Sequence, residues 1–146
     1  MMKRLGILSG LATVFAVGLA IGRMTGPSDV VHAQGNNRVF ELRTYTSPDG
    51  KLADLHARFR NHTTTLFQKH GITNIGYWVP QDAPASSNTL IYIIAYPNRE
   101  EAKKRWAAFQ ADPEWRKALT ASQVNGPLQN KVESVFMDPL DFSPLK

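Results

Sequence analysis

Hydrophobic and polar residues follow two different periods along the chain, and the changes between them mark out the expected elements. Residues 39–46 alternate with a period of two, so that charged and aromatic side chains fall on one face and mainly apolar ones on the other. Such alternation predicts a β-strand. Further strands are expected at 72–79, 90–96 and 132–137, and helices at 51–70, from 98 to about 111, and from 113 to about 125.

Capping residues support these boundaries. Gly71 stands where a helix C-terminus favours glycine. Asn98 and Glu101 have the spacing of a capping box, and Asp112 followed by Pro113 has the composition of a helix N-terminus. These signals predict where the first helix ends and where the next two begin.

The predicted order is strand, helix, strand, strand, helix, strand. This is the ferredoxin-like α+β plan, βαββαβ, in which helices cover one face of a four-stranded antiparallel sheet. The third strand is apolar on both faces over residues 90–95, so both faces should be covered. Because the helices cover one face only, we expect the other to pack against the same face of a second copy in a two-fold homodimer.

Three histidines fall on the first predicted helix. At 100° per residue, His56, His62 and His70 all lie within or beside the sector of leucine and phenylalanine side chains. We therefore take His62 as a candidate catalytic residue and His56 as a candidate pocket residue, whereas His70, next to Gly71, suits a helix C-terminus. An ordinary role at the rim of the core is the alternative for all three.

Glu41, Arg43 and Tyr45 share one face of the first strand. If that face is buried, the two charges must pair, because an unpaired buried charge is costly. One interpretation is a structural ion pair or an exposed strand face, which we favour. The other is a polar patch in which Arg43 binds an anionic or carbonyl-bearing ligand.

Aromatic residues are spread over the strands and the second helix, and we expect most of them in the core and the interface. Trp106 and Phe109 recur at helical spacing and form a packing stripe. Tyr77 and Tyr92, together with Glu41 and His56, are candidates for lining a ligand pocket.

Several function classes find little support. The formal net charge is +5, but the basic residues are scattered, and the run Lys103-Lys104-Arg105 follows two glutamates on a solvated helix face; we expect no nucleic-acid partner. The histidine spacings of six and eight residues differ from the i, i+4 metal pair, and there is no cysteine, so we predict no metal site. No nucleophile, phosphate-loop or dinucleotide motif is present, nothing specific points to haem, and we predict no cofactor.

The first 33 residues have the composition of a secretory signal peptide. Lys3 and Arg4 precede an uncharged run at 5–21, and Val31 and Ala33 form a plausible cleavage site. The alternative is an uncleaved anchor, because a run of 17 residues is near the lower limit for a membrane-spanning helix. We favour cleavage, and expect an exported protein, periplasmic or secreted, with one domain at 34–146.

A family resemblance lies in four short segments, which are Glu41-Leu42-Arg43-Thr44-Tyr45, Gly76-Tyr77-Trp78, Ala111-Asp112-Pro113-Glu114-Trp115-Arg116 and Asp138-Pro139-Leu140-Asp141-Phe142-Ser143-Pro144. In this order they resemble the NIPSNAP family over about residues 38–144. The resemblance implies a dimeric α/β barrel, and it attaches no catalytic role to the Glu-Leu-Arg-x-Tyr pattern.

Two functions stay open, and a third, a membrane-tethered structural module, applies if the N-terminal segment is not cleaved. The one we favour is a homodimeric, non-catalytic module that binds a protein partner or a small apolar or aromatic ligand. The alternative is a cofactor-free enzyme of the monooxygenase or isomerase type, by analogy with the wider barrel superfamily. In that case His62 would act as base, Arg43 would stabilise oxyanion charge, and Tyr45 would line the same pocket.

Overall fold

The computed structural model describes residues 38–146, and its elements run in the predicted order. The strands are β1 (Val39–Thr46), β2 (Thr73–Trp78), β3 (Thr89–Tyr96) and β4 (Lys131–Met137). The helical segments are α1 (Leu52–Arg58), the π-helical η1 (Phe59–Thr63), α2 (Thr64–Lys69), the short 3₁₀ turn η2 (Ala85–Ser87), α3 (Arg99–Ala111) and α4 (Pro113–Ser122). The ferredoxin-like α+β prediction is confirmed.

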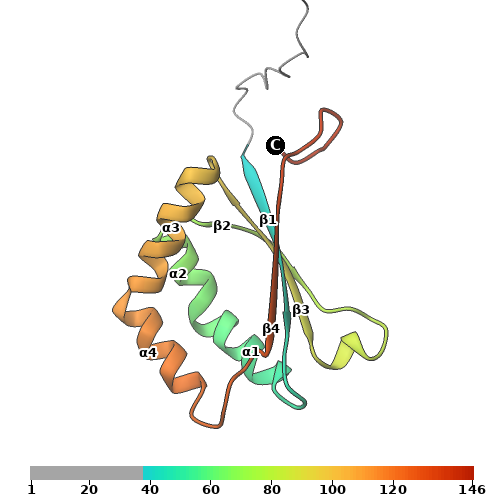
Figure 1. The fold of residues 1–146 in the computed structure, drawn as a ribbon, viewed down its shortest axis with the longest axis vertical. Helices are drawn as coiled ribbons and strands as arrows, with labels where there is room; N and C mark the ends of the chain where they lie inside the picture. Colours follow the sequence, from blue (N-terminus) through green and yellow to red (C-terminus); the bar gives the residue numbers. More distant parts are fainter. Residues whose placement is uncertain (1–37) are drawn as a thin grey trace, which may run out of the picture. The chain divides into compact units, whose positions relative to one another are not determined.

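The four strands form one antiparallel sheet in the order β2-β3-β1-β4, so β1 is a central strand with a partner on each side. Its register sets Glu41 opposite Ile94 and Arg43 opposite both Tyr92 and Ser134. All α-helices pack on one face of the sheet (Figure 1). The side chains of Glu41, Arg43 and Tyr45 on β1 therefore face the helices.

The helix predicted at 51–70 is present but contains one widened turn. The backbone N–H of Thr64 donates to the carbonyl of Phe59, five residues back, and the hydroxyl of Thr63 donates to the carbonyl of Arg58. The five-residue spacing of the backbone bond is that of a π-helix, and the side-chain bond of Thr63 spans the same distance along the chain. Because a constant 100° per residue does not hold across such a turn, the predicted inward position of His62 is wrong: Thr63 is buried and His62 is exposed.

The caps of α3 and α4 follow the predicted residues. The side chain of Asn98 accepts from the backbone N–H of Glu101, and that of Asp112 accepts from the N–H of Glu114. The capping box is only half formed, since the Glu101 carboxylate pairs with Arg105 at 2.9 Å. Each cap satisfies an N–H group that the helix itself cannot.

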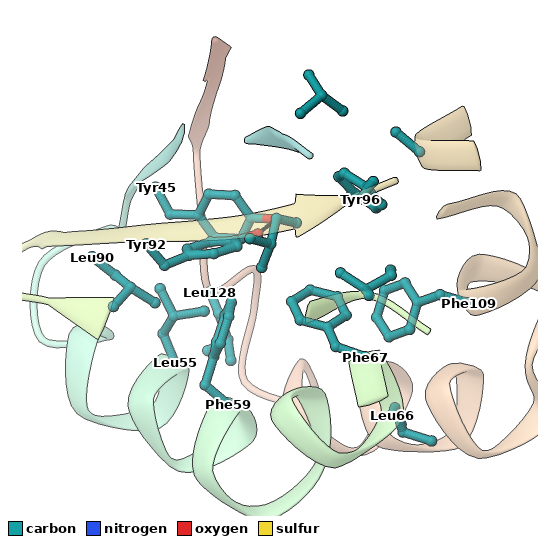
Figure 2. Close-up of a cluster of buried hydrophobic side chains, with 14 of the residues drawn as sticks. Tyr45, Leu55, Phe59, Leu66, Phe67, Leu90, Tyr92, Tyr96, Phe109 and Leu128 are labelled. Carbon is teal, nitrogen blue, oxygen red and sulfur yellow. Dashed lines mark hydrogen bonds between the residues drawn. The ribbon is translucent and has the colours of Figure 1, made fainter. Parts of the chain in front are cut away.

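The core lies between the helices and the sheet and is built from aromatic rings. Tyr92 is fully buried at its centre, stacked on Tyr77 at 5.5 Å and edge-on to Phe59 at 5.1 Å. Figure 2 shows Phe67 and Phe109 extending the cluster toward α3. Burial of each such ring contributes on the order of 1.5–3 kcal/mol.

The opposite face of the sheet carries apolar side chains that no helix covers. Trp78 is 50% exposed and Val135 is 54% exposed. Leu42, Ile91 and Ile93 are half-buried on the same face. After β4, residues 138–146 form a loop whose end is held by Arg38, which donates to the carbonyl of Lys146 at 2.8 Å.

Residues 38–146 contain no helix that is both long and apolar enough to cross a bilayer. The predicted signal peptide at 1–33, and its alternative as an anchor, lie outside the described residues.

Candidate functional site

A hydrogen-bond network crosses the helix-facing surface of the sheet from β3 to β4. Arg43 Nη1 donates to Glu41 Oε1 at 2.5 Å, and Arg43 Nη2 donates to the Tyr45 hydroxyl at 3.3 Å. The Tyr92 hydroxyl donates to Tyr45 at 3.0 Å. The predicted candidates Glu41, Arg43, Tyr45 and Tyr92 therefore belong to one connected cluster, which we call the β1 network.

Glu41 is the acceptor on which the network converges. Its two oxygens accept from the hydroxyls of Tyr96 at 3.0 Å and Ser134 at 2.6 Å, in addition to Arg43. Because three donors share one buried carboxylate, the geometry is that of a paired and satisfied charge rather than a free acid. Of the two predicted alternatives for Glu41 and Arg43, the structural ion pair is present, and it lies on a central rather than an exposed strand.

Burial and neighbouring charges shift the pKa of two groups of the network, Arg43 and Tyr96. Burial acts to lower the pKa of Arg43, but the oxygens of Tyr92, Tyr45 and Glu41 outweigh it, so the pKa lies above its ordinary value. Burial, and then the Glu41 carboxylate, raise the pKa of Tyr96. Arg43 is therefore a permanent cation and the Tyr96 phenol stays neutral, and such groups suit binding better than proton transfer.

A cleft of about 630 Å³ opens between α3 and the β4 edge of the sheet, above this network. Glu41, Arg43 and Ser134 lie in its floor. Its walls are aromatic, because Trp106 projects from α3 and Phe136 from β4. This combination of apolar walls and a few polar groups is typical of small-molecule sites.

Arg43 is the polar group best placed to serve a ligand there. Its guanidinium lies 4.2 Å from the centre of the Trp106 ring, a cation–π contact. Its Nε atom is buried and has no hydrogen-bond partner. A buried N–H donor without a hydrogen bond is costly, so a ligand oxygen that accepted from Arg43 Nε would be favoured.

His56 and Tyr77 line a second, smaller cavity of about 290 Å³ with Phe59, Trp78 and Leu90. His56 Nε2 is buried without a hydrogen-bond partner. Burial, and then the positive charge of Arg60, lower the pKa of His56, so its imidazole is neutral at pH 7. The structure therefore brings these two predicted pocket residues together, but apart from the cleft above Arg43.

His62 is not part of either cavity. It lies on the helix surface facing α4 and lines hollows formed with Asn61 and Ala118. The predicted grouping of His62 with Arg43 and Tyr45 in one pocket is therefore not formed in the structure. His70, the third candidate, bonds through Nε2 to the buried Asp112 carboxylate at 2.6 Å.

Residues 38–146 hold no group of three His, Asp or Glu side chains placed to bind a metal ion. The prediction of no cofactor has no test here and stays a prediction.

Sequence reasoning missed the cleft-lining residues Trp106, Ser134 and Phe136 as site residues. The helical spacing of Trp106 predicts a packing stripe rather than a site. Ser134 and Phe136 lie beside Glu41 only because β1 pairs with β4. Alternation along β4 could have indicated these two residues, because it places Val132, Ser134 and Phe136 on one face of the strand.

Comparisons with known proteins agree with this architecture. The family model for NIPSNAP matches residues 40–144. A crystal structure of a NIPSNAP family protein of unknown function from Agrobacterium tumefaciens is 24% identical, with a TM-score of 0.67, and the match covers 80% of this chain and 100% of that one. An uncharacterised NIPSNAP-like domain protein from Burkholderia xenovorans is 21% identical, with a TM-score of 0.65, over 75% and 91% of the two chains.

A more distant structural match is SnoaB, a cofactor-independent oxygenase from Streptomyces nogalater. It is 14% identical with a TM-score of 0.51, over 74% of this chain and 98% of that one, and the likeness shows the fold alone. A search of the curated proteins found no match. With the family model spanning most of the chain and the ferredoxin-like sheet bearing the Glu-Leu-Arg-x-Tyr network, this chain belongs to the NIPSNAP family.

Proposed function

We propose that this protein is a homodimeric module that binds a small aromatic or apolar ligand in the cleft between α3 and the sheet. The observation that carries the proposal is the buried, unpartnered Nε of Arg43 in a cleft walled by Trp106 and Phe136. An aromatic ligand would stack against Trp106 while a carbonyl or hydroxyl oxygen accepted from Arg43.

A binding role is favoured over catalysis because the cleft floor has no group poised to exchange a proton. Glu41 already accepts from Arg43, Tyr96 and Ser134. The polar side chains that α3 contributes to the cleft are two cations, Arg99 and Lys103, one acid, Glu100, and one amide, Gln110. With Arg43 in the floor, three cations face a partly anionic ligand. The floor of the cleft can therefore hold and orient a molecule, while its Glu41 carboxylate is already engaged by three donors.

Native mass spectrometry of protein purified from an exporting host tests this proposal. The expected result is a dimer with a discrete extra mass, which Trp106→Leu and Arg43→Met each reduce at least tenfold in occupancy. Arg60→Met, which removes an exposed arginine on the same side of the sheet, is the matched control and should retain the mass. A ligand that both cleft variants retain would contradict the assignment of the cleft, and a protein that carries none and responds to no aromatic carbonyl compound would contradict binding.

The homodimer itself is proposed from the uncovered sheet face. Leu42, Ile91 and Ile93 lie at its centre, and Trp78 and Val135 lie toward its edges. Face-to-face packing with a second copy would remove these side chains from water and form a two-fold interface.

A second candidate function, a cofactor-free oxygenase, is favoured by the cavity that holds His56. Its imidazole is neutral with a free Nε2, and Tyr77 and Trp78 supply aromatic walls. In such an enzyme His56 would remove a proton from a phenolic substrate before the substrate reacts with oxygen. Oxygen consumption with a panel of hydroquinones tests this, and turnover that survives His56→Ala would count against it.

A further inference from the structure

Arg58 is a buried arginine without a buried acid beside it. Only 2% of its surface is exposed, at the end of α1 and directly before the π turn. Its Nη2 donates to Gln129 Oε1 at 2.9 Å, and its Nη1 has a long contact of 3.4 Å with Ser122 Oγ. Its Nε is buried with no partner, so the guanidinium leaves much of its donor capacity unused.

The other buried charges of residues 38–146 are already balanced. Glu41 pairs with Arg43. Asp112 pairs with Lys69 at 2.9 Å and with His70 at 2.6 Å. No ion pair among the described residues includes Arg58. The acid that lines the same cavity, Asp54, is exposed and pairs with Lys51 at 3.8 Å, so no carboxylate of residues 38–146 lies within ion-pair distance of the Arg58 guanidinium.

Neither of the aromatic neighbours supplies a negative charge to Arg58. Trp115 lies with its ring centre 5.4 Å from the Arg58 guanidinium, a cation–π contact that lowers the cost of burial without cancelling the charge. Burial raises the pKa of the nearby Tyr92 far above its ordinary value, so its phenol stays neutral. Burial lowers the pKa of Arg58, which is the direction expected for an uncompensated cation.

A cavity of about 330 Å³ leads from the surface to Arg58. It lies between the helix of residues 52–69 and α4. Arg58 and Ala118 are the buried residues of its lining, and they form the inner end of the cavity. Ala57 and Ala121 make its walls apolar, and Asn61 and Asn125 provide amide groups nearer the surface.

We propose that this cavity is a binding site for a small organic monocarboxylate, whose carboxylate pairs with Arg58 and whose apolar part lies between Ala57 and Ala121. A planar guanidinium with a free Nε matches the two oxygens of a carboxylate. The single positive charge of Arg58 matches the single negative charge of a monocarboxylate. The Asp54 carboxylate, which also lines the cavity, disfavours a dianion such as hydrogen phosphate.

This site is distinct from the cleft of the proposed function, which lies between α3 and β4 and contains Arg43. Binding at either site can therefore be lost without loss at the other.

Titration of the purified protein with sodium benzoate, at constant ionic strength, tests the site. The Nε–H resonance of Arg58 in a ¹H–¹⁵N spectrum, identified by its absence from Arg58→Met, should shift and saturate, and the melting temperature should rise. Benzamide, the neutral counterpart of the same shape, should produce neither effect. Arg58→Lys should bind benzoate at least tenfold more weakly, and the exposed neighbour change Arg60→Met should bind it as the wild type does.

Three results would overturn the proposal. The first is the absence of a saturable Nε–H shift in the wild type, a measurement that needs no variant to fold. The second is an equal response to benzamide, which would make the cavity apolar rather than anion-binding. The third is saturable binding of inorganic phosphate without binding of benzoate, which would assign a different ligand class.

Stability of the ligand-free variants gives a further test. Arg58→Met should melt at or above the temperature of the wild type, because it removes a buried charge that has no counter-ion. A large fall in its melting temperature would mean that Gln129, Ser122 and Trp115 satisfy the guanidinium by themselves, and would count against a ligand.

Discussion

Glu41 and Arg43 lie two positions apart on the buried face of β1, and each depends on the other. Their contact at 2.5 Å is largely removed from water, with the Arg43 side chain 13% exposed and that of Glu41 4% exposed. Loss of one partner leaves the other buried and unpaired, which is the expensive change in such a pair.

We predict that Glu41→Ala lowers the free energy of unfolding by about 3–5 kcal/mol, measured by urea denaturation. The matched control is Glu133→Ala on β4, where the pair with Lys131 is exposed and the expected change is below about 1 kcal/mol. The double variant Glu41→Met/Arg43→Met should recover most of the loss, since it removes both charges together. A double variant less stable than Glu41→Ala would show that the network as a whole, rather than the unpaired charge, determines the cost.

Asp112 makes stability depend on pH in the acid range. Hydrogen bonds from His70 and Lys69 hold the pKa of its carboxyl well below its ordinary value of 3.8. Between the folded and the unfolded pKa the unfolded chain binds more protons, so the stability that Asp112 contributes is fully present above the unfolded value and is lost as the pH falls through the folded one.

The expected result is a stability difference between wild type and Asp112→Asn that is constant above about pH 5 and shrinks as the pH falls below about 4. Urea midpoints from pH 2 to pH 6 measure it. Asp49→Asn, in an exposed turn, is the control and should show no such pH-dependent difference. A difference for Asp112→Asn that stays constant down to pH 2 would contradict the role of the buried carboxylate.

The π turn Phe59–Thr63 is the element whose geometry departs most from its sequence pattern. An i→i+5 bond spans one residue more than an α turn does. Removal of one exposed residue from this turn should therefore restore an α-helix and keep Phe59 and Leu66 in the core.

We predict that deletion of Arg60 changes the free energy of unfolding by less than about 1 kcal/mol, as expected when no core contact is lost. Deletion of Lys104 is the control, because α3 has no widened turn and the deletion rotates Trp106 and Phe109 by about 100° relative to Ala102. That control should be strongly destabilised in thermal melts. Equal loss in both deletions would mean that the π turn is required for packing.

The uncovered sheet face determines how the whole molecule behaves in solution. We predict that the wild type is a dimer and that Ile93→Glu, at the centre of this face, makes it a monomer, because a buried unpaired carboxylate would face its own symmetry copy. Light scattering after size-exclusion chromatography measures the mass. Val124→Glu, at a site 77% exposed on the helix side, is the control and should leave the dimer intact. A wild type that is monomeric at all concentrations would contradict the interface.

Export is also a property of the whole chain. Cleavage after Ala33 predicts a mature protein that begins at Gln34, and its intact mass after purification from the exporting host measures this. A protein that retains its first residues and fractionates with membranes would support the anchor instead.

Sequence by itself determined the order of elements and most of their ends. Alternation along residues 39–46, the caps at Asn98 and Asp112 and the glycine at Gly71 are local features, and local geometry decides whether a strand or a helix can form. The ferredoxin-like plan also predicted correctly that the helices would cover one face of the sheet only. The cover that the apolar positions of the third strand predict for the other face stays a prediction.

Tertiary structure decided which polar residues from distant segments meet. The sequence places His62 beside an apolar sector, but the π turn moves it to the surface, and a fixed helical angle cannot foresee such a turn. Ser134 reaches Glu41 only through strand pairing across 93 residues. The sequence does not predict that Arg58 is buried, since an arginine on an amphipathic helix is normally solvated. Its burial against Trp115 depends on how α4 packs against the first helix. Neither segment alone determines that packing.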